Sequence, residues 1–185
     1  MTHMAIDDAG WLQSVAVFRS PNCNARPADA QIKLVVVHGI SLPPGEYGGD
    51  HIQDFFCNRL DPDLHPYFAT ISEMTVSAHC LVERDGNILQ FVSFDQRAWH
   101  AGESQWHGES NCNDFSIGIE LEGCDDDPYE GAQYESLARL IRALRTHYPA
   151  IGEDAITGHC DIAPGRKTDP GPSFDWKRLG ALLED

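Results

Sequence analysis

Two stretches of the chain have the apolar patterns of β-strands. The run Ile32–Val37 (IKLVVV) contains three consecutive valines, and a continuous β-branched run is typical of a strand buried on both faces. The run Ser116–Glu122 (SIGIELE) alternates, so its isoleucines and leucine share one face while Gly118 and Glu120 share the other. A carboxylate is costly to bury, so we expect Glu120 to have a partner or a function. Glu122 could share the face of Glu120, but the nearer it lies to the strand end, the more we expect it to be a surface charge.

Other segments add a hairpin and helices. The stretches Ala78–Glu83 and Ile88–Phe94 flank an Asp-Gly dipeptide, which is a strong hairpin signal. Within Ala132–Tyr148 the leucines and the isoleucine recur at helical spacing, which predicts a helix packed on the sheet. The remaining predicted elements are a short helix over Asp50–Asn58 inside a loop-rich segment, a short strand at Ala155-Ile156, a last helix over Phe174–Leu183, and a strand or helix over Trp11–Phe18.

The order of these elements predicts a single α/β domain with a central mixed β-sheet flanked by helices. A chain of 185 residues fits one domain and can bury a full core. The sequence contains neither a repeat nor a linker. We therefore take residues 1–185 as one domain, with its core at about 31–176.

Charge and composition narrow the possible functions. The formal net charge of −16 argues against binding to nucleic acid or to an anionic membrane surface. A metal together with Arg166 and Lys167 would reverse that sign locally. The chain shows neither a stretch of membrane-spanning length nor a signal-peptide pattern. Six scattered cysteines without a CxxC pair are expected to be free thiols. We expect a cytoplasmic protein, with a monomer as the default.

Candidate chemistry concentrates between Thr157 and Trp176 (TGHCDIAPGRKTDPGPSFDW). This stretch holds His159, Lys167 and Asp169 among prolines and glycines, which favour one fixed loop shape. Imidazole and carboxylate groups are zinc ligands, and a catalytic zinc takes three protein ligands and keeps one position open. The stretch supplies two such ligands, so a third must come from elsewhere.

His38 is the candidate third ligand. It ends the predicted central strand, and sites in α/β sheets gather at the carboxyl ends of strands. A histidine that simply caps the strand end is the alternative. The residue pattern favours structural roles for His51, His65, His79 and His100, although the last two could line a pocket.

These residues together describe a hydrolytic site. His38, His159 and Asp169 form a His₂–carboxylate set with an open fourth position, which is a catalytic zinc arrangement. Glu120 would act as the general base, because zinc lowers the pKa of a bound water to about 7. Lys167 would stabilise the oxyanion. The constellation predicts zinc-assisted hydrolysis of an amide or ester.

The chain also resembles a known family over nearly its full length. The matching stretches are VVHGISLPPGEYGG, LDPDLHPYF, VSAHCLVERDG, RAWHAGES, CNDFSIGIELEG and TGHCDIAPGRKTDPGPSFDW. They are similar to the zinc-dependent N-acetylmuramoyl-L-alanine amidases, most closely the cytoplasmic AmpD group. The resemblance implies that His38, His159 and Asp169 bind Zn²⁺. It also implies that Glu120 is the catalytic carboxylate and Lys167 the transition-state stabiliser, whereas the residues alone do not rank His38 above the other histidines.

The same resemblance implies a substrate. Enzymes of this group cut the amide between the lactyl group of (1,6-anhydro-)N-acetylmuramic acid and L-alanine in muropeptides, during peptidoglycan recycling. It implies a mixed sheet with the zinc cleft on one face. Gly39 and Thr75 depart from the group, which has an amide and a basic side chain at these positions. The departures affect the expected substrate contacts and leave the metal chemistry intact.

Two other classes of function fit parts of the sequence. Relatives of this fold that bind peptidoglycan without cutting it are one, but they typically lack a ligand or the catalytic group, and all five positions are filled here. A cysteine hydrolase using Cys80 or Cys160 is the other. Each cysteine directly follows a histidine, and adjacent side chains on a strand point to opposite faces, which works against a catalytic pair.

Overall fold

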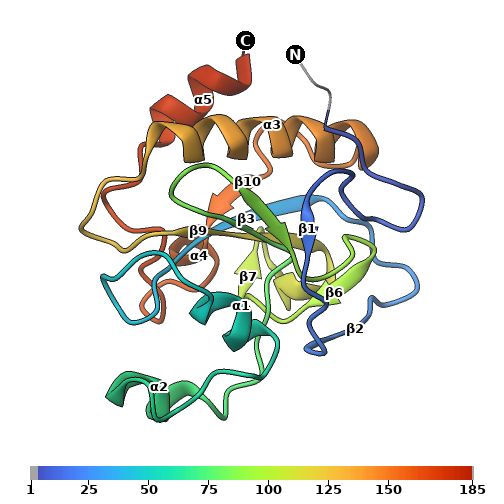
Figure 1. Ribbon diagram of the computed structural model, residues 1–185. Coiled ribbons are helices and arrows are strands. Elements are labelled where there is room, and N and C mark those ends of the chain that lie inside the picture. Colours follow the sequence, from blue (N-terminus) through green and yellow to red (C-terminus); the bar gives the residue numbers. More distant parts are fainter. Residues whose placement is uncertain (1–3, 185) are drawn as a thin grey trace.

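A six-stranded mixed sheet forms the centre of the protein. The computed structural model describes residues 4–184. Strands β4 (Cys80–Val82) and β5 (Ile88–Gln90) are antiparallel, as the hairpin signal predicts, and the other neighbouring pairs are parallel. The fold class predicted from the sequence is confirmed (Figure 1). In spatial order the strands are β1 (Ala16–Val17), β5 (Ile88–Gln90), β4 (Cys80–Val82), β9 (Ser116–Glu122), β3 (Leu34–Ile40) and β10 (Ile156–Gly158).

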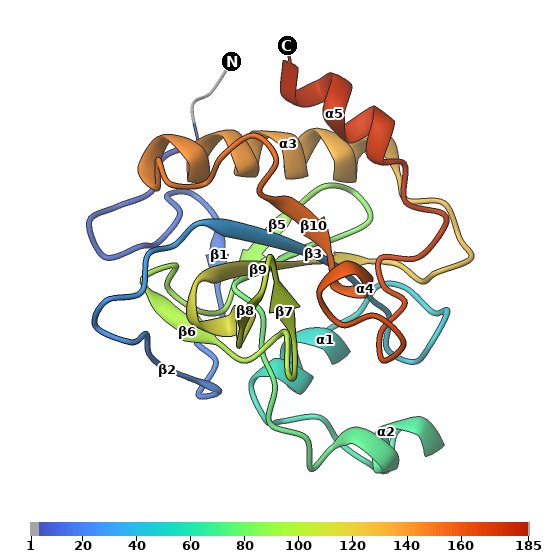
Figure 2. The same ribbon diagram turned by 180° about the vertical axis from the view of Figure 1, so that it is seen from behind.

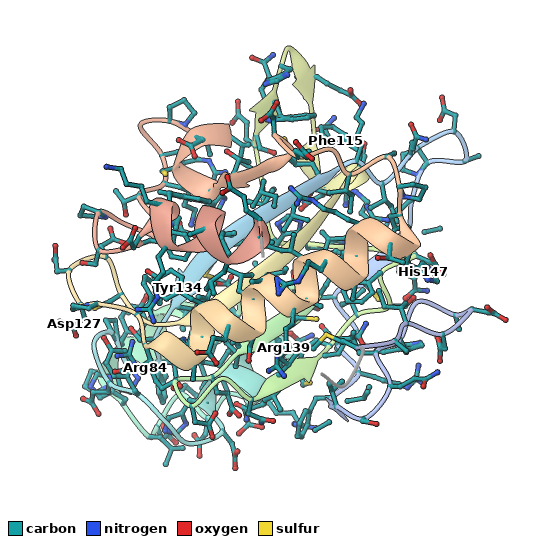
Figure 3. The ribbon with its side chains drawn as sticks, turned by 90° about the horizontal axis from the view of Figure 1, so that it is seen from above. Arg84, Phe115, Asp127, Tyr134, Arg139 and His147 are labelled. Carbon is teal, nitrogen blue, oxygen red and sulfur yellow. The ribbon has the colours of Figure 1, made fainter. Side chains whose placement is uncertain are left out.

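Two helices cover the upper face of this sheet. Helix α3 (Gly131–His147) lies over the sheet and runs roughly along its long central strands, and α5 (Trp176–Glu184) packs on it (Figures 1 and 3). The predicted helical face of α3 is buried, with Leu137 and Leu140 completely inaccessible to solvent. These side chains meet the odd-numbered face of β9, including Ile117 and Ile119, in the largest apolar cluster. Both helices and this face of β9 agree with the sequence pattern.

The lower face of the sheet carries shorter elements. The largest are helices α1 (His51–Phe56) and α2 (Pro66–Ile71), which lie below the sheet in Figure 1. Figure 2 shows the hairpin of β7 (Gln105–Trp106) and β8 (Glu109–Ser110), and helix α4 (His159–Ile162), from behind. Two separate apolar clusters occupy this face, one around Phe56 and one around Val36. The remaining elements are α4 (His159–Ile162), the 3₁₀ turn η1 (Cys112–Asp114), and the strand pairs β2 (Cys23–Ala25) with β6 (Gln96–Ala98) and β7 (Gln105–Trp106) with β8 (Glu109–Ser110).

Some local details differ from the sequence prediction. Helix α2 is absent from that prediction because six residues are too few to show helical periodicity, and the structure starts it with Pro66 and a His65 cap. The undecided stretch Trp11–Phe18 contributes only the two residues of β1.

All six cysteines are free thiols, as expected. Among residues 4–184, no helix has both the length and the apolar composition needed to cross a bilayer.

Glu122 is buried, so its prediction as a surface charge is wrong. Its side chain accepts hydrogen bonds from the backbone N–H groups of Gly48, at 2.5 Å, and Arg84, at 3.1 Å. A buried carboxylate needs such donors. The contact connects the end of β9 to two loops that are 38 and 74 residues away in the sequence.

A second contact connects the same loops on the outside. The Arg84 guanidinium lies over the ring of Tyr47, 4.6 Å from its centroid, and the Tyr47 hydroxyl donates to Asp127 at 2.7 Å. Arg84 and Asp127 lie near the N-terminal end of α3 in Figure 3, opposite the end marked by His147. The glycine-rich loop after β3 is therefore held against the loop after β9.

Candidate active site

The register of the parallel strands places the candidate residues in one row. His38 of β3 is the register partner of Glu120 of β9. Gly158 of β10 is the partner of Val37, so His159, the next residue, follows beside His38. On the other side of Glu120 the register partner is Leu81, which is buried. Three residues that are distant in the sequence thus meet because their strands are neighbours.

Three candidate ligand atoms converge at one end of this row. His38 Nδ1 lies 3.0 Å from His159 Nδ1, and each of these nitrogens lies 3.1 Å from Asp169 Oδ2. Four ligands arranged tetrahedrally around zinc at bond lengths of about 2.0–2.1 Å are about 3.3 Å apart. The three atoms therefore already have nearly the spacing of one face of a zinc coordination tetrahedron. This set is the candidate metal centre within the described part of the chain.

The chemistry of the donors fits a cation at this position. The outer nitrogen of His159, Nε2, lies 3.1 Å from the carbonyl oxygen of Ala101. A carbonyl only accepts hydrogen bonds, so Nε2 carries the proton and Nδ1 turns a lone pair toward the other two atoms. Burial lowers the pKa of His38 to about 4, so this imidazole is neutral at pH 7. Neutral imidazole is the form that binds a metal.

Asp169 completes the set as a carboxylate. The main chain fixes its place, because the Cys160 N–H donates to the Asp169 carbonyl at 2.9 Å. The next carbonyl, of Pro170, accepts a hydrogen bond from the Tyr129 hydroxyl, also at 2.9 Å.

Tyr129 also explains why residue 39 is glycine. A Cβ atom at Gly39 would lie 2.2 Å from the Tyr129 hydroxyl oxygen, which is closer than two such atoms can approach. This position therefore has no room for the amide side chain that the resemblance leads one to expect. Thr75, the second departure, is exposed, and its neighbours Met74 and Val76 line the cleft in its place.

Glu120 is an ionisable group in a largely apolar setting. Its Oε1 lies 3.9 Å from His38 Nδ1, and its buried Oε2 has no hydrogen-bond partner among residues 4–184. Burial raises the pKa of Glu120 well above its ordinary value, and the nearby Asp169 raises it further, while Lys167 lowers it. A carboxyl group with a raised pKa beside candidate metal ligands is suited to accept and return a proton.

The two basic residues of the loop have different surroundings. Lys167 is exposed and lines the same cleft as Glu120 and Asp169. Arg166 also lines the cleft, but its guanidinium donates hydrogen bonds to the carbonyls of Ala101 and Glu103. Arg166 therefore holds the neighbouring loop, whereas the Lys167 ammonium is free to meet a ligand.

A cleft of about 660 Å³ opens onto this site. The candidate residues form one part of its wall, and Asp125 and Asp126 lie on its rim. Another part of the wall is apolar and includes the partly exposed Tyr67 and Met74. The volume lies within the usual range of about 300–1,000 Å³ for small-molecule sites.

Three of the other predicted histidine roles agree with the structure. His65 caps α2, and His51 packs against Phe68. His79 is buried and accepts a hydrogen bond from the Gly118 N–H through Nδ1. His100 is different, because its Nδ1 lies 2.9 Å from His38 Nε2. The sequence offers no local signal for that contact.

The environment of the cysteines argues against a thiol nucleophile. Cys80 is completely buried, and burial raises the pKa of its thiol. Burial also raises the pKa of the Cys160 thiol. The thiolate is the reactive form, so both shifts work against nucleophilic catalysis.

Fold and site together define a class of protein. Convergent imidazole and carboxylate atoms lie toward the carboxyl ends of parallel strands, beside a buried carboxyl group with a raised pKa. This arrangement is that of a hydrolase with a metal-type centre, built on a mixed α/β fold. Residues 28–172 match the family model for N-acetylmuramoyl-L-alanine amidase, and the chain belongs to that family.

Individual relatives agree over nearly the whole chain. The 1,6-anhydro-N-acetylmuramyl-L-alanine amidase AmpD of Citrobacter freundii is 57% identical over 176 residues, which cover 95% of this chain and 94% of that protein. A crystal structure of a selenomethionine AmpD derivative matches with a TM-score of 0.94 at 57% identity, covering 97% of this chain and 99% of that one. The Escherichia coli amidase AmiD, in complex with the substrate anhydro-N-acetylmuramic acid-L-Ala-D-γ-Glu-L-Lys, matches with a TM-score of 0.60 at 30% identity, covering 98% and 66%.

The contact between Gly39 and Tyr129 gives a first prediction. Gly39→Ala should lower the free energy of unfolding by about 1–3 kcal/mol, the usual cost of overpacking. Gly39 does not have a positive φ, so the cost comes from the clash alone. Tyr129→Phe removes the clashing oxygen and leaves the ring carbon Cζ at 3.5 Å from the new Cβ. In urea unfolding, Gly39→Ala should therefore cost less in the Tyr129→Phe background. Simple additivity of the two effects would contradict the contact.

The raised pKa of Glu120 gives a second prediction, for the metal-free protein. A carboxyl group whose pKa is higher in the folded state stabilises the fold fully below its ordinary pKa of 4.5, and this contribution is lost as the pH rises toward the folded pKa. Glu120→Gln stays neutral throughout. The variant should therefore become more stable relative to the wild type between pH 4 and 8, in urea unfolding with a chelator present. Parallel stability curves would show that the pKa of Glu120 is not raised.

Proposed function

We propose that this protein is a zinc-dependent amidase that cuts the amide between the lactyl group of N-acetylmuramic acid, including its 1,6-anhydro form, and L-alanine in muropeptides. The observation that carries the proposal is the convergence of His38, His159 and Asp169 within 3.1 Å of one another, with Glu120 beside them. The AmpD relatives carry the name of a 1,6-anhydro-N-acetylmuramyl-L-alanine amidase, and the AmiD complex holds an anhydromuramyl peptide.

His38 and His159, through Nδ1, and Asp169, through Oδ2, would hold the zinc ion. Zinc at such a site supplies Lewis acidity toward a carbonyl oxygen and makes a water molecule acidic near neutral pH. The three side chains leave one side of the centre facing the cleft, which all three help to line. A catalytic zinc needs such an open position.

Glu120 is assigned the proton transfers. Its carboxylate accepts a proton from the attacking water, which adds to the carbonyl carbon of the amide. The tetrahedral intermediate then collapses, the C–N bond breaks, and Glu120 returns the proton to the alanine nitrogen. The products are the lactyl carboxylic acid and a free peptide amine. A raised pKa suits both steps, because the group must hold the proton between them.

Lys167 is assigned the charge that develops on the amide oxygen. An ammonium near that oxygen stabilises the intermediate more than the substrate, which is the requirement for catalysis. A bound zinc ion together with Arg166 and Lys167 would counter the carboxylates of the cleft, in a chain with a formal net charge of −16. Muropeptides carry carboxylates, so this local compensation would favour their entry.

The same proposal includes the setting of the reaction. A role in peptidoglycan recycling places the protein in the cytoplasm, where it would act as a monomer and as one domain spanning residues 1–185. The negative net charge agrees with a small-molecule substrate and with the absence of nucleic-acid or membrane partners.

The test of this function is a single incubation read by mass spectrometry. The purified protein is given an anhydro-muropeptide, with and without a chelator, and free stem peptide is measured. We expect cleavage that stops with the chelator and returns with added Zn²⁺. Zinc-loaded protein that binds the muropeptide without cutting it would instead make the chain a peptidoglycan-binding module.

Two variants separate the assigned roles. Glu120→Gln should lower kcat by about 10²-fold or more, the scale of general acid–base catalysis, and keep its zinc. Asp169→Ala should lose zinc first and activity with it. Zinc content by elemental analysis, measured beside kcat, checks both. A Glu120→Gln protein without zinc, or an Asp169→Ala protein with full zinc, would overturn the corresponding role.

A further inference from the structure

His100 lies against the lower face of β9, behind the candidate metal centre. It follows strand β6 and is buried. On this lower face its ring lies directly against Gly118, where a Cβ atom would be only 2.3 Å from the imidazole. The small residue on this face of β9 therefore makes room for His100. The ring of His38 stands perpendicular to that of His100, with centroids 5.0 Å apart.

A series of contacts runs from the Cys112 carbonyl through Ser116 and His100 to His38, and its proton positions follow from the shortest of them. Ser116 Oγ lies 2.5 Å from the carbonyl oxygen of Cys112. Two oxygens this close need a hydrogen between them, and a carbonyl has none, so the Ser116 hydroxyl is the donor. The hydroxyl has only one hydrogen, so it accepts from His100 Nε2, which lies 3.0 Å away.

The direction of the hydrogen bond from His100 to Ser116 determines the tautomer of His38. With its proton on Nε2, His100 has a free lone pair on Nδ1. His38 Nε2, at 2.9 Å, must then donate to it. The proton of neutral His38 is therefore on the outer nitrogen, and the lone pair of Nδ1 points at His159 and Asp169. His38 is therefore in the same Nε2–H tautomer as His159, whose outer N–H donates to the Ala101 carbonyl.

One short segment thus holds both histidines. His100 binds the outer nitrogen of His38, and the adjacent Ala101 binds that of His159. The buried side chain of Asn113 fixes this segment, because its Oδ1 accepts from the backbone N–H groups of His100, at 3.1 Å, and Ala101, at 2.8 Å.

We propose that His100 is a positioning residue of the metal centre, which sets the tautomer of His38 by accepting its Nε2 proton. His100 touches neither the candidate metal position nor the reacting atoms. Its effect is to offer the Nδ1 lone pair of His38 in advance. Outer partners of metal-binding histidines typically contribute about 10–100-fold to metal affinity. The effect on zinc rests on the proposed function, whereas the tautomer of His38 does not.

The first measurement is the tautomer itself, in the metal-free wild-type protein. Long-range ¹H–¹⁵N NMR spectra distinguish an imidazole protonated on Nε2 from one protonated on Nδ1. We expect His38 in the Nε2–H form. A wild-type His38 protonated on Nδ1 would overturn the proposal whether or not the protein binds zinc, and whether or not any variant folds.

The second measurement is zinc affinity, by competition with a chromophoric chelator. His100→Phe keeps a ring but removes the acceptor, and should weaken zinc binding by about 10–100-fold. His100→Asn offers an amide oxygen near the place of Nδ1 and should recover part of this loss. Folded His100→Phe protein with wild-type affinity and an unchanged His38 tautomer would overturn the proposal.

A matched control is His79→Phe. His79 is also a buried imidazole beside β9, but its ring nitrogens contact the Gly118 N–H, the Gln96 carbonyl and the Arg26 guanidinium, and none of the candidate ligands among residues 4–184. This variant should lose stability and keep the His38 tautomer and the zinc affinity. Equal loss of affinity in both variants would mean that the effect comes from general loosening of the fold.

Discussion

The close approach of three electron-pair donors is the constraint on which the rest of this structure depends. Two imidazole nitrogens and one carboxylate oxygen stand 3.0–3.1 Å apart. Lone pairs at this separation repel unless a proton or a cation lies among them, so the surrounding protein must hold the three side chains in place. Because the candidate ligands are already ordered, binding of a cation would require little further loss of side-chain entropy. The contacts that stabilise the fold around these three side chains are therefore also the ones that prepare the candidate metal centre.

The sheet provides most of that rigidity. Parallel pairing sets His38 beside Glu120, and the crossover that brings β10 next to β3 adds His159 to the same row. The row shares the lower face of the sheet with two apolar clusters, and its His38, Glu120 and His159 are buried there. Burial raises the pKa of Glu120 and lowers that of His38, so a single cause prepares a candidate proton acceptor and a neutral candidate ligand.

Side chains that never touch the site hold the loops around it. Tyr129 binds the Pro170 carbonyl directly after Asp169, and Glu122 binds the loop after β3. Asn113 holds the segment behind both histidines. Each of these contacts uses a buried polar group whose partner is a backbone group, so the geometry of a loop depends on one side chain.

The sequence by itself determined the main elements of the sheet and its covering helices, and it indicated the candidate chemistry. The apolar patterns that predict β3, β9 and α3 are formed by residues close together in the sequence, so they can be read without the fold. The position of Glu120 on β9, on the same strand face as small residues, already indicated an unusual carboxylate. The late loop supplied two ligand types at short range. Even so, residues alone could not rank His38 above His79, and the resemblance to a family was needed for that choice.

Only the tertiary structure decided how these parts are connected. The burial of Glu122, the restriction to glycine at position 39 and the contact of His100 with His38 each join segments between 38 and 90 residues apart. Such contacts leave no periodic or local pattern, because the residue that needs the space or the hydrogen bond lies on another strand or loop. The small residues of β9 show this clearly: the sequence indicates that space exists beside Glu120, and the folded chain fills it with His100.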